Sequence, residues 1–260
     1  MWAVTCQLRK EKVVMKYNGI SDIGKIRDTN QDSYIIVTNE NKDVLALVCD
    51  GIGGGKSGDI ASSTTTRFIA ESFAKNGGFT DAEEAKLWLK RILLKVNDYI
   101  FTMSTTEEKY EGMGTTLVGV LICNQGRFVA NVGDSRAYFL CEGEDLVSIT
   151  EDHNMATELY QMKLIKKEDI EKHPQRNVLT NAIGVVGNIK VDIFPLERKA
   201  MTLLLATDGL HGYVKEEEIK KILDGKKTLQ RKTKQLVSLA NDSGGYDNTT
   251  IILIELKEGE

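Results

Sequence analysis

The stretch Val44–Gly54, VLALVCDGIGG, joins a continuous apolar run directly to an Asp-Gly turn. Such a run, bounded by glycine, is typical of a buried β-strand. The pattern returns at Leu203–Leu210, LLLATDGL, so Asp50 and Asp208 each follow an apolar strand. One Asp-Gly pair alone is ordinary turn chemistry. Two pairs that follow apolar strands predict carboxylates that can converge at the ends of neighbouring strands.

Other short apolar or β-branched runs predict further strands along the chain. The full set expected is 33–38, 44–49, 116–123, 127–132, 137–141, 201–207 and 249–256. Helices are expected at 60–75, from about 80 onward, at 215–223 and at 229–240. Because strands and helices do not alternate strictly, antiparallel sheets covered by helices are favoured over a doubly wound parallel sheet.

The second of these helices has a defined start and a defined face. Thr80 and Glu83 form a capping-box pattern at its beginning. Its apolar positions recur every three or four residues, which predicts one buried face made of Trp88, Ile92, Val96 and Tyr99.

Composition restricts the class of protein. The net charge of -4 and the pI near 5.6 leave no basic excess for binding a nucleic-acid backbone. No apolar run is long enough to cross a bilayer, and the first ten residues lack the apolar core of a secretion signal, so we expect a cytoplasmic protein. The four cysteines have no metal-site spacing, and none has an arginine six positions later, as a cysteine-based phosphatase loop would need.

Domain organisation is predicted to be simple. The 260 residues contain no internal repeat and no linker-like segment, which favours a single domain. A second methionine, Met15, begins MKYNGISDIG, so residues 1–14 are interpreted as an N-terminal extension of uncertain status and residues 15–260 as the domain itself.

Two further carboxylates occupy comparable positions. Asp247 follows a glycine-rich turn just before the strand 249–256, and Asp134 follows the strand 127–132. Two like charges about 4 Å apart repel by roughly 4 kcal/mol at an effective dielectric near 20, so several ionised aspartates need cations to share a pocket. Oxygen ligands favour Mg²⁺ or Mn²⁺ over zinc. In GKIRDTNQDS, Arg27 adds a guanidinium suited to phosphate beside Asp32.

Eight motifs together resemble the protein phosphatase 2C family of metal-dependent phosphatases, especially its compact bacterial Ser/Thr branch. The resemblance runs from about Ile20 to Leu256 and keeps the family's motif order. The motifs are RDTNQD (27–32), DGIGG (50–54), GMGTT (112–116), VGDSRAY (132–138), TEDH (150–153), HPQRNVLTNAIG (173–184), LLLATDGL (203–210) and DNTT (247–250).

The resemblance implies an α+β fold, an αββα sandwich of two antiparallel sheets flanked by helices. It implies metal-dependent hydrolysis of phosphoserine and phosphothreonine in proteins, with two or three Mn²⁺ or Mg²⁺ ions. The implied ligands are Asp50, which bridges two ions, the Gly51 carbonyl, Asp208 and Asp247, with Asp134 and Asp208 at a third ion. Arg27 would hold the substrate phosphate, and Asp32 would hold metal-bound water.

The same resemblance makes 154–176 a mobile flap beside the active site. The implied partners are phosphorylated proteins, among them a bacterial Ser/Thr kinase and its targets. We expect a monomer with no nucleic-acid or membrane partner. The chain departs from the family pattern at Ile52, where some members have a histidine, at Gln31 and at Asn181.

Rival interpretations remain at this point. DGIGGGKSG resembles a phosphate-binding loop, but the first glycine of that loop would fall on Asp50. Gly53, Gly55 and Gly58 match the dinucleotide pattern GxGxxG, but no parallel βαβ unit surrounds them. A phosphoprotein-binding module without activity and a phosphatase for small molecules are two more functions that the sequence allows. His153, His173 and His211 share no spacing, and structural or surface roles are expected for them.

Overall fold

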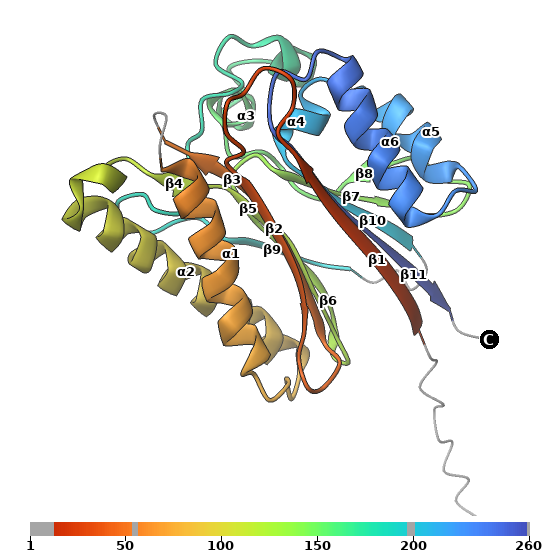
Figure 1. Ribbon diagram of the computed structural model, residues 1–260, viewed down its shortest axis with the longest axis horizontal. Helices are drawn as coiled ribbons and strands as arrows, with labels where there is room; N and C mark the ends of the chain where they lie inside the picture. Colours follow the sequence, from red (N-terminus) through yellow and green to blue (C-terminus); the bar gives the residue numbers. More distant parts are fainter. Residues whose placement is uncertain (1–12, 54–56, 197–200, 259–260) are drawn as a thin grey trace, which may run out of the picture.

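Two antiparallel sheets pack face to face, and helices cover the outer face of each (Figure 1). The computed structural model describes residues 13–53, 57–196 and 201–258. The five-stranded sheet has the order β1 (Val13–Asp22), β11 (Thr249–Glu258), β10 (Met201–Ala206), β7 (Arg136–Leu140), β8 (Val147–Ser148). The six-stranded sheet has the order β2 (Asp32–Thr38), β3 (Val44–Ile52), β5 (Leu117–Cys123), β6 (Gly126–Val132), β9 (Asp192–Pro195), with β4 (Gly114–Thr115) paired to β3.

Three apolar clusters hold these layers together. The cluster between the sheets includes Val48 and Val120 from one sheet and Leu205 and Ile252 from the other. The outer face of the six-stranded sheet packs on α1 (Gly58–Ala74) and α2 (Ala82–Thr106). The five-stranded sheet packs on α5 (Glu216–Asp224) and α6 (Leu229–Asp242). Burial on both faces explains why the central strands read as continuous apolar runs. The predicted αββα sandwich is confirmed.

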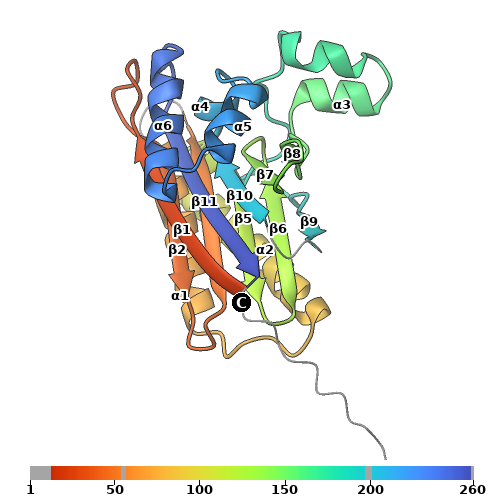
Figure 2. The same ribbon diagram turned by 90° about the vertical axis from the view of Figure 1, so that its right-hand side faces the viewer.

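The segment between β8 and β9 forms the remaining part of the structure. It contains α3 (Met155–Gln161) and the short 3₁₀ helix η2 (Lys167–Lys172), and an isolated bridge joins Asn154 to Leu179. Figure 2 shows α3 standing beyond the ends of the strands, to one side of α4 (Asp208–His211) and α5. The other short helix, η1 (Glu108–Tyr110), follows α2. The segment predicted to be a flap, 154–176, therefore lies outside the sandwich.

Most predicted elements agree with the structure to within three residues at their ends, but two details of α2 were wrong. The N-cap is Asp81, whose side chain accepts a hydrogen bond from the Glu84 nitrogen, so the predicted Thr80–Glu83 box is displaced by one residue. Tyr99 is 46% exposed, so the predicted buried face fails at its last position. The buried side of the helix instead includes Leu89, Leu93 and Ile100.

The N-terminal end differs from expectation in one respect. β1 begins at Val13 and pairs with the last strand, β11, along its whole length, a strand that the sequence patterns did not predict. Residues 1–12, which make up most of the predicted extension, lie outside the described residues. Within the part of the chain that is described, no helix combines the length and the apolar character needed to span a membrane.

Candidate active site

Five aspartates gather where corresponding ends of the two sheets meet. Asp32 begins β2 and lies directly opposite Asp50 of β3 in the antiparallel register. Asp134 occupies the turn from β6 to β7, which carries the chain from one sheet to the other. Asp208 begins α4 just after β10, and Asp247 lies two residues before β11. The structure thus brings together all the carboxylates that the sequence patterns singled out.

Burial and mutual repulsion both act on these carboxyl groups. Burial, followed by the charges of Asp32, Asp208, Asp134 and Asp247, raises the pKa of Asp50 well above its ordinary value. Burial raises the pKa of Asp32 to about 7 and, with the charge of Asp247, raises that of Asp208 to about 6. The pKa of Asp134 is also raised, first by burial and then by the charge of Asp208. Each shift marks a cost of holding negative charge at this place.

Two oxygens of this group lack any protein partner. Asp32 Oδ1 and Asp208 Oδ1 are buried without a hydrogen bond. A buried carboxylate oxygen without a donor is unfavourable unless a cation or water meets it. Among the described residues, no three side chains of His, Cys, Asp or Glu surround a single point closely enough to hold an ion by themselves. A cation here would therefore need main-chain or water oxygens as well, a donor set that Mg²⁺ and Mn²⁺ accept.

The backbone at Asp50 is fixed from both sides. The Asp50 nitrogen donates to Thr116 Oγ1 over 3.0 Å, and Thr115 Oγ1 donates to the Asp50 carbonyl oxygen over 2.8 Å. The next residue must be glycine, because a Cβ on Gly51 would lie 2.6 Å from the Gln31 carbonyl oxygen and closer still to the main chain of Gly58. The motif GMGTT therefore positions Asp50, a role that sequence patterns alone did not assign.

Asn248 holds the loop that carries Arg27. Its side-chain oxygen accepts from the Gln31 nitrogen over 2.8 Å, and its amide nitrogen donates to the carbonyls of Ile23 and Thr29 over 2.9 and 3.1 Å. The side chain is only 5% exposed. Asn248 belongs to the motif DNTT, and no function was predicted for it, although a buried asparagine at the start of a strand is a typical loop anchor.

Arg27 and Asp32 are both engaged within this group. Arg27 Nη2 lies 2.7 Å from Asp247 Oδ2, and this hydrogen bond raises the pKa of the guanidinium group further. The Arg27 side chain is nevertheless 52% exposed, so it stays accessible to a ligand. Thr207 Oγ1 donates to Asp32 Oδ2 over 2.9 Å, which leaves Oδ1 directed away from that contact.

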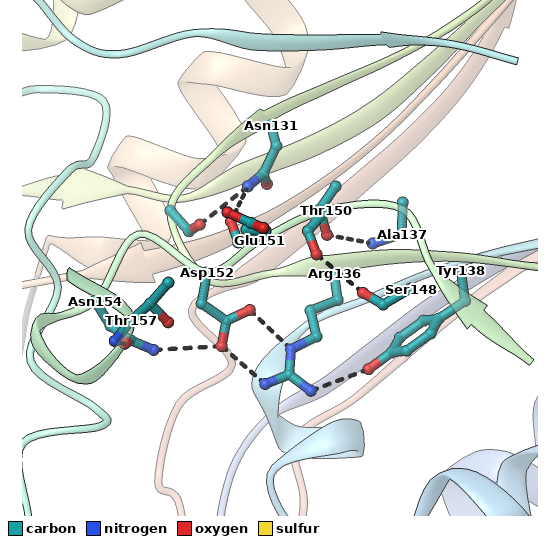
Figure 3. A network of polar contacts seen from close by, with 11 residues as sticks. Asn131, Arg136, Ala137, Tyr138, Ser148, Thr150, Glu151, Asp152, Asn154 and Thr157 are labelled. Atoms are coloured by element: carbon teal, nitrogen blue, oxygen red, sulfur yellow. Dashed lines mark hydrogen bonds and ion pairs between the residues drawn. The ribbon is translucent and has the colours of Figure 1, made fainter. Parts of the chain in front are cut away.

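A largely buried ion pair between Arg136 and Asp152 connects the strand after the Asp134 turn to the segment that carries α3 (Figure 3). Arg136 donates from Nε and Nη2 to the two oxygens of Asp152, each over 2.8 Å, and from Nη1 to the Tyr138 hydroxyl over 3.3 Å. Asp152 also accepts from Asn154, and Asn154 caps α3 by accepting from the Thr157 nitrogen. This network makes the position of α3 depend on the strand that follows Asp134.

The three histidines have distinct surroundings. His153 is 5% exposed, accepts from the Gly133 nitrogen at Nδ1 and pairs with Asp192 at Nε2. His173 accepts a local hydrogen bond from the Gln175 nitrogen. Burial lowers the pKa of His211, whose Nε2 has no partner. None of the three belongs to the aspartate group, although His211 borders the same cavity as Asp208.

A cavity of about 580 Å³ opens beside the aspartates. Its lining includes Asp134 and Asp208 and also Glu171 and Arg176 of the segment after α3. A larger cavity of about 1330 Å³, between β11 and the connection from α5 to α6, contains none of the predicted site residues. Gly54, Gly55 and Lys56, which matter for the phosphate-loop and dinucleotide interpretations, lie outside the described residues.

This chain is similar to known protein phosphatases over most of its length. The family model for protein phosphatase 2C matches residues 27–244. The serine/threonine phosphatase stp of Listeria innocua is 38% identical over 236 residues, which cover 90% of this chain and 93% of that protein. Protein phosphatase PhpP of Streptococcus pneumoniae is 32% identical, covering 94% and 98% of the two chains.

Solved structures show the same relationship. The serine/threonine phosphatase of S. agalactiae superposes with a TM-score of 0.88 at 31% identity, and the match covers 94% of this chain and 100% of that one. The serine/threonine phosphatase PstP/Ppp of Mycobacterium tuberculosis superposes with a TM-score of 0.79 at 28% identity, covering 94% and 99%. The similarity therefore extends over nearly the whole sandwich.

Proposed function

Since this chain belongs to the protein phosphatase 2C family and is a protein-serine/threonine phosphatase, we propose that it hydrolyses phosphoserine and phosphothreonine in proteins with two or three Mn²⁺ or Mg²⁺ ions. The observation that carries this proposal is the group of buried aspartates with raised pKa values at the end of the sandwich. Removing that many carboxylates from water without cations would be strongly unfavourable.

Specific oxygens are assigned to the ions in this proposal. Asp50 would bridge two ions, and the Gly51 carbonyl, Asp208 and Asp247 would supply the other protein ligands. Asp134 and Asp208 would hold a third. The unpartnered oxygen of Asp208 supports this assignment, and the lack of any all-side-chain cluster in the described residues agrees with ligand sets completed by a carbonyl and water. Bound ions of this kind lower the pKa of water and offset phosphoryl charge during in-line attack.

Asp32 and Arg27 would position the attacking water and the substrate phosphate. Asp32, whose Oδ2 accepts from Thr207, has Oδ1 left to accept a hydrogen bond and would so hold the attacking water in place. Arg27 would exchange its Asp247 contact for the phosphate oxygens of the substrate, which a half-exposed guanidinium can reach. Ile52 offers no proton to the leaving oxygen, so water must supply it.

The proposal also includes the domain organisation, the location and the partners of the enzyme. Residues 15–260 would act as one catalytic domain, with 154–176 as a flap that opens and closes over the cavity beside Asp208. The enzyme would work as a cytoplasmic monomer on phosphorylated proteins. A Ser/Thr kinase and the targets of that kinase would be its partners.

The test measures hydrolysis of p-nitrophenyl phosphate and of a phosphothreonine peptide with Mn²⁺, with Mg²⁺ and with EDTA. Turnover is expected with either ion, none with EDTA, and at least a thousand-fold less in Asp208→Ala, because one ligand of the ions is lost. Asp98→Ala, an exposed aspartate of α2, is the matched control and should retain full activity. Inactivity of the wild type under every condition would instead identify a phosphoprotein-binding module.

Arg27→Ala separates phosphate binding from metal binding. This variant should raise KM for the peptide while Mn²⁺ affinity, measured by calorimetry, stays close to that of the wild type. Loss of Mn²⁺ affinity as large as in Asp208→Ala would show that Arg27 supports the ions and not the phosphate.

A further inference from the structure

Two tyrosine rings meet at the rim of the active site. Tyr213 lies shortly after α4, five positions beyond Asp208, and Tyr246 directly precedes Asp247. The ring centroids are 5.4 Å apart, and the ring planes are inclined by 40°. The two residues are 39% and 54% exposed, so the pair presents an aromatic surface to solvent.

The main chain next to Tyr246 is anchored beside the Arg27 loop. Gly244 has a φ of +129°, a conformation that favours glycine, and a Cβ there would lie 2.6 Å from Cδ2 of the Tyr246 ring as it stands. The same turn is tied to the Arg27 loop, because the nitrogens of Lys25 and Ile26 donate to the Gly245 carbonyl over 2.8 and 3.2 Å. The main chain that carries the Tyr246 ring is therefore held close to Arg27.

Tyr213 connects the pair to the reaction centre. It lines the 580 Å³ cavity together with Asp134, Asp208 and Arg176. Burial, and then the negative charges of Asp208 and Asp247, raises the pKa of its hydroxyl. Through Tyr213, the aromatic pair therefore borders the same cavity as the carboxylates and the segment that follows α3.

We propose that Tyr213 and Tyr246 form a specificity platform that binds an apolar side chain of the substrate protein next to its phosphorylated residue. This inference rests on the proposed function, because the phosphorylated residue must lie at the neighbouring aspartates. Tyrosine rings provide a large contact area at a small cost in conformational entropy, which suits recognition of a flexible segment.

The charges around the platform are of both signs. Asp208 and Asp247 act on the Tyr213 hydroxyl with negative charge, and Arg27 and Arg176 act on it with positive charge. This mixed surrounding gives neither an acidic nor a basic side chain a one-sided attraction, so the contact area of the two rings is the main feature available for recognition. A leucine-sized group packed on the rings removes apolar area from water, which favours an apolar side chain.

Two phosphothreonine peptides that differ only beside the phosphorylated residue test this proposal. One peptide has leucine at the flanking positions and the other has glycine. With Mn²⁺ present, the wild type should hydrolyse the leucine peptide with a kcat/KM about ten-fold higher, mainly through KM, because the flanking contact is the same in the ground state and the transition state. Tyr213→Ala and Tyr246→Ala should each reduce the ratio towards one, and Tyr246→Phe should retain it.

Tyr99→Ala is the matched control. Tyr99 is similarly exposed, at 46%, and also belongs to an aromatic pair, with its ring 5.3 Å from that of Phe68, but it lies on α2 away from the cavity. Its variant should keep the ten-fold ratio. The platform is refuted if the wild type shows no preference, if both alanine variants keep the preference, or if they slow both peptides equally. Failure of the wild type to hydrolyse either peptide would overturn the proposed function, and the platform with it.

Discussion

Removing Asp152 should destabilise the sandwich by leaving Arg136 without its partner. The two charge-assisted hydrogen bonds between them are both 2.8 Å long, and the side chains are 21% and 10% exposed. In Asp152→Ala, the guanidinium group would keep only the 3.3 Å contact with Tyr138, which is itself fully buried. Its remaining donors would have only the water of the neighbouring cavity, which Arg136 lines.

The size of the loss follows from this geometry. Removing one partner of a buried ion pair costs about 3 to 5 kcal/mol, and water that reaches the partly exposed Arg136 favours the lower end, about 3 kcal/mol. For a chain of this length, 1 kcal/mol lowers Tm by roughly 2 to 4 °C, so Asp152→Ala should unfold roughly 6 to 12 °C below the wild type.

A double-mutant cycle of thermal unfolding provides the assay. Arg136→Met combined with Asp152→Ala should recover at least half of the lost stability, because no charge is left without a partner. The pair Lys220 and Asp224, at 2.9 Å on the surface of α5, is the control, and its removal should cost less than about 0.5 kcal/mol. The reasoning fails if Asp152→Ala costs under about 1 kcal/mol, or if the losses of the single variants simply add.

The metal-free enzyme should become less stable as pH rises from about 4 to about 7. Folding raises the pKa of Asp32 to about 7 and of Asp208 to about 6, so the folded state retains protons that the unfolded chain releases above pH 4. The reasoning would be contradicted by a Tm that rises over this pH range in EDTA. An Asp32→Asn variant whose Tm depends on pH as steeply as that of the wild type would also contradict it. Asn248→Ala should cost about 3 kcal/mol in urea unfolding, because three main-chain groups lose their partner, and should raise KM by loosening the Arg27 loop. A loss under about 1 kcal/mol would show that water replaces the amide.

The central strands and the main helices could be predicted from the sequence because their patterns are local. Val44–Cys49 and 203–206 are buried on both faces, so each reads as an unbroken apolar run. β1 was missed since its residues, VVMKYNGISD, include polar positions and a glycine, and its pairing with β11 spans almost the entire chain. A strand stabilised by so distant a partner leaves a weak local signal.

The residues of the candidate site could be predicted from the sequence only where they belong to a motif. The five aspartates and Arg27 stand in motifs that resemble a known family, and the structure brings them together. The contact between Arg27 and Asp247, 2.7 Å, joins residues 220 positions apart and could not be foreseen from spacing. Arg136, Asn248, Thr116 and Thr207 act by holding other residues, and a supporting hydrogen bond has no sequence pattern of its own.

The candidate site draws its aspartates from both sheets, Asp32 and Asp50 from one, Asp208 and Asp247 from the other, with Asp134 on the turn between them. Neither sheet alone contains a complete set. A newly made chain whose sheets have formed but not yet docked would therefore have no assembled centre. Dephosphorylation therefore requires the two sheets to be docked, and a partly folded chain with separated sheets would be inactive.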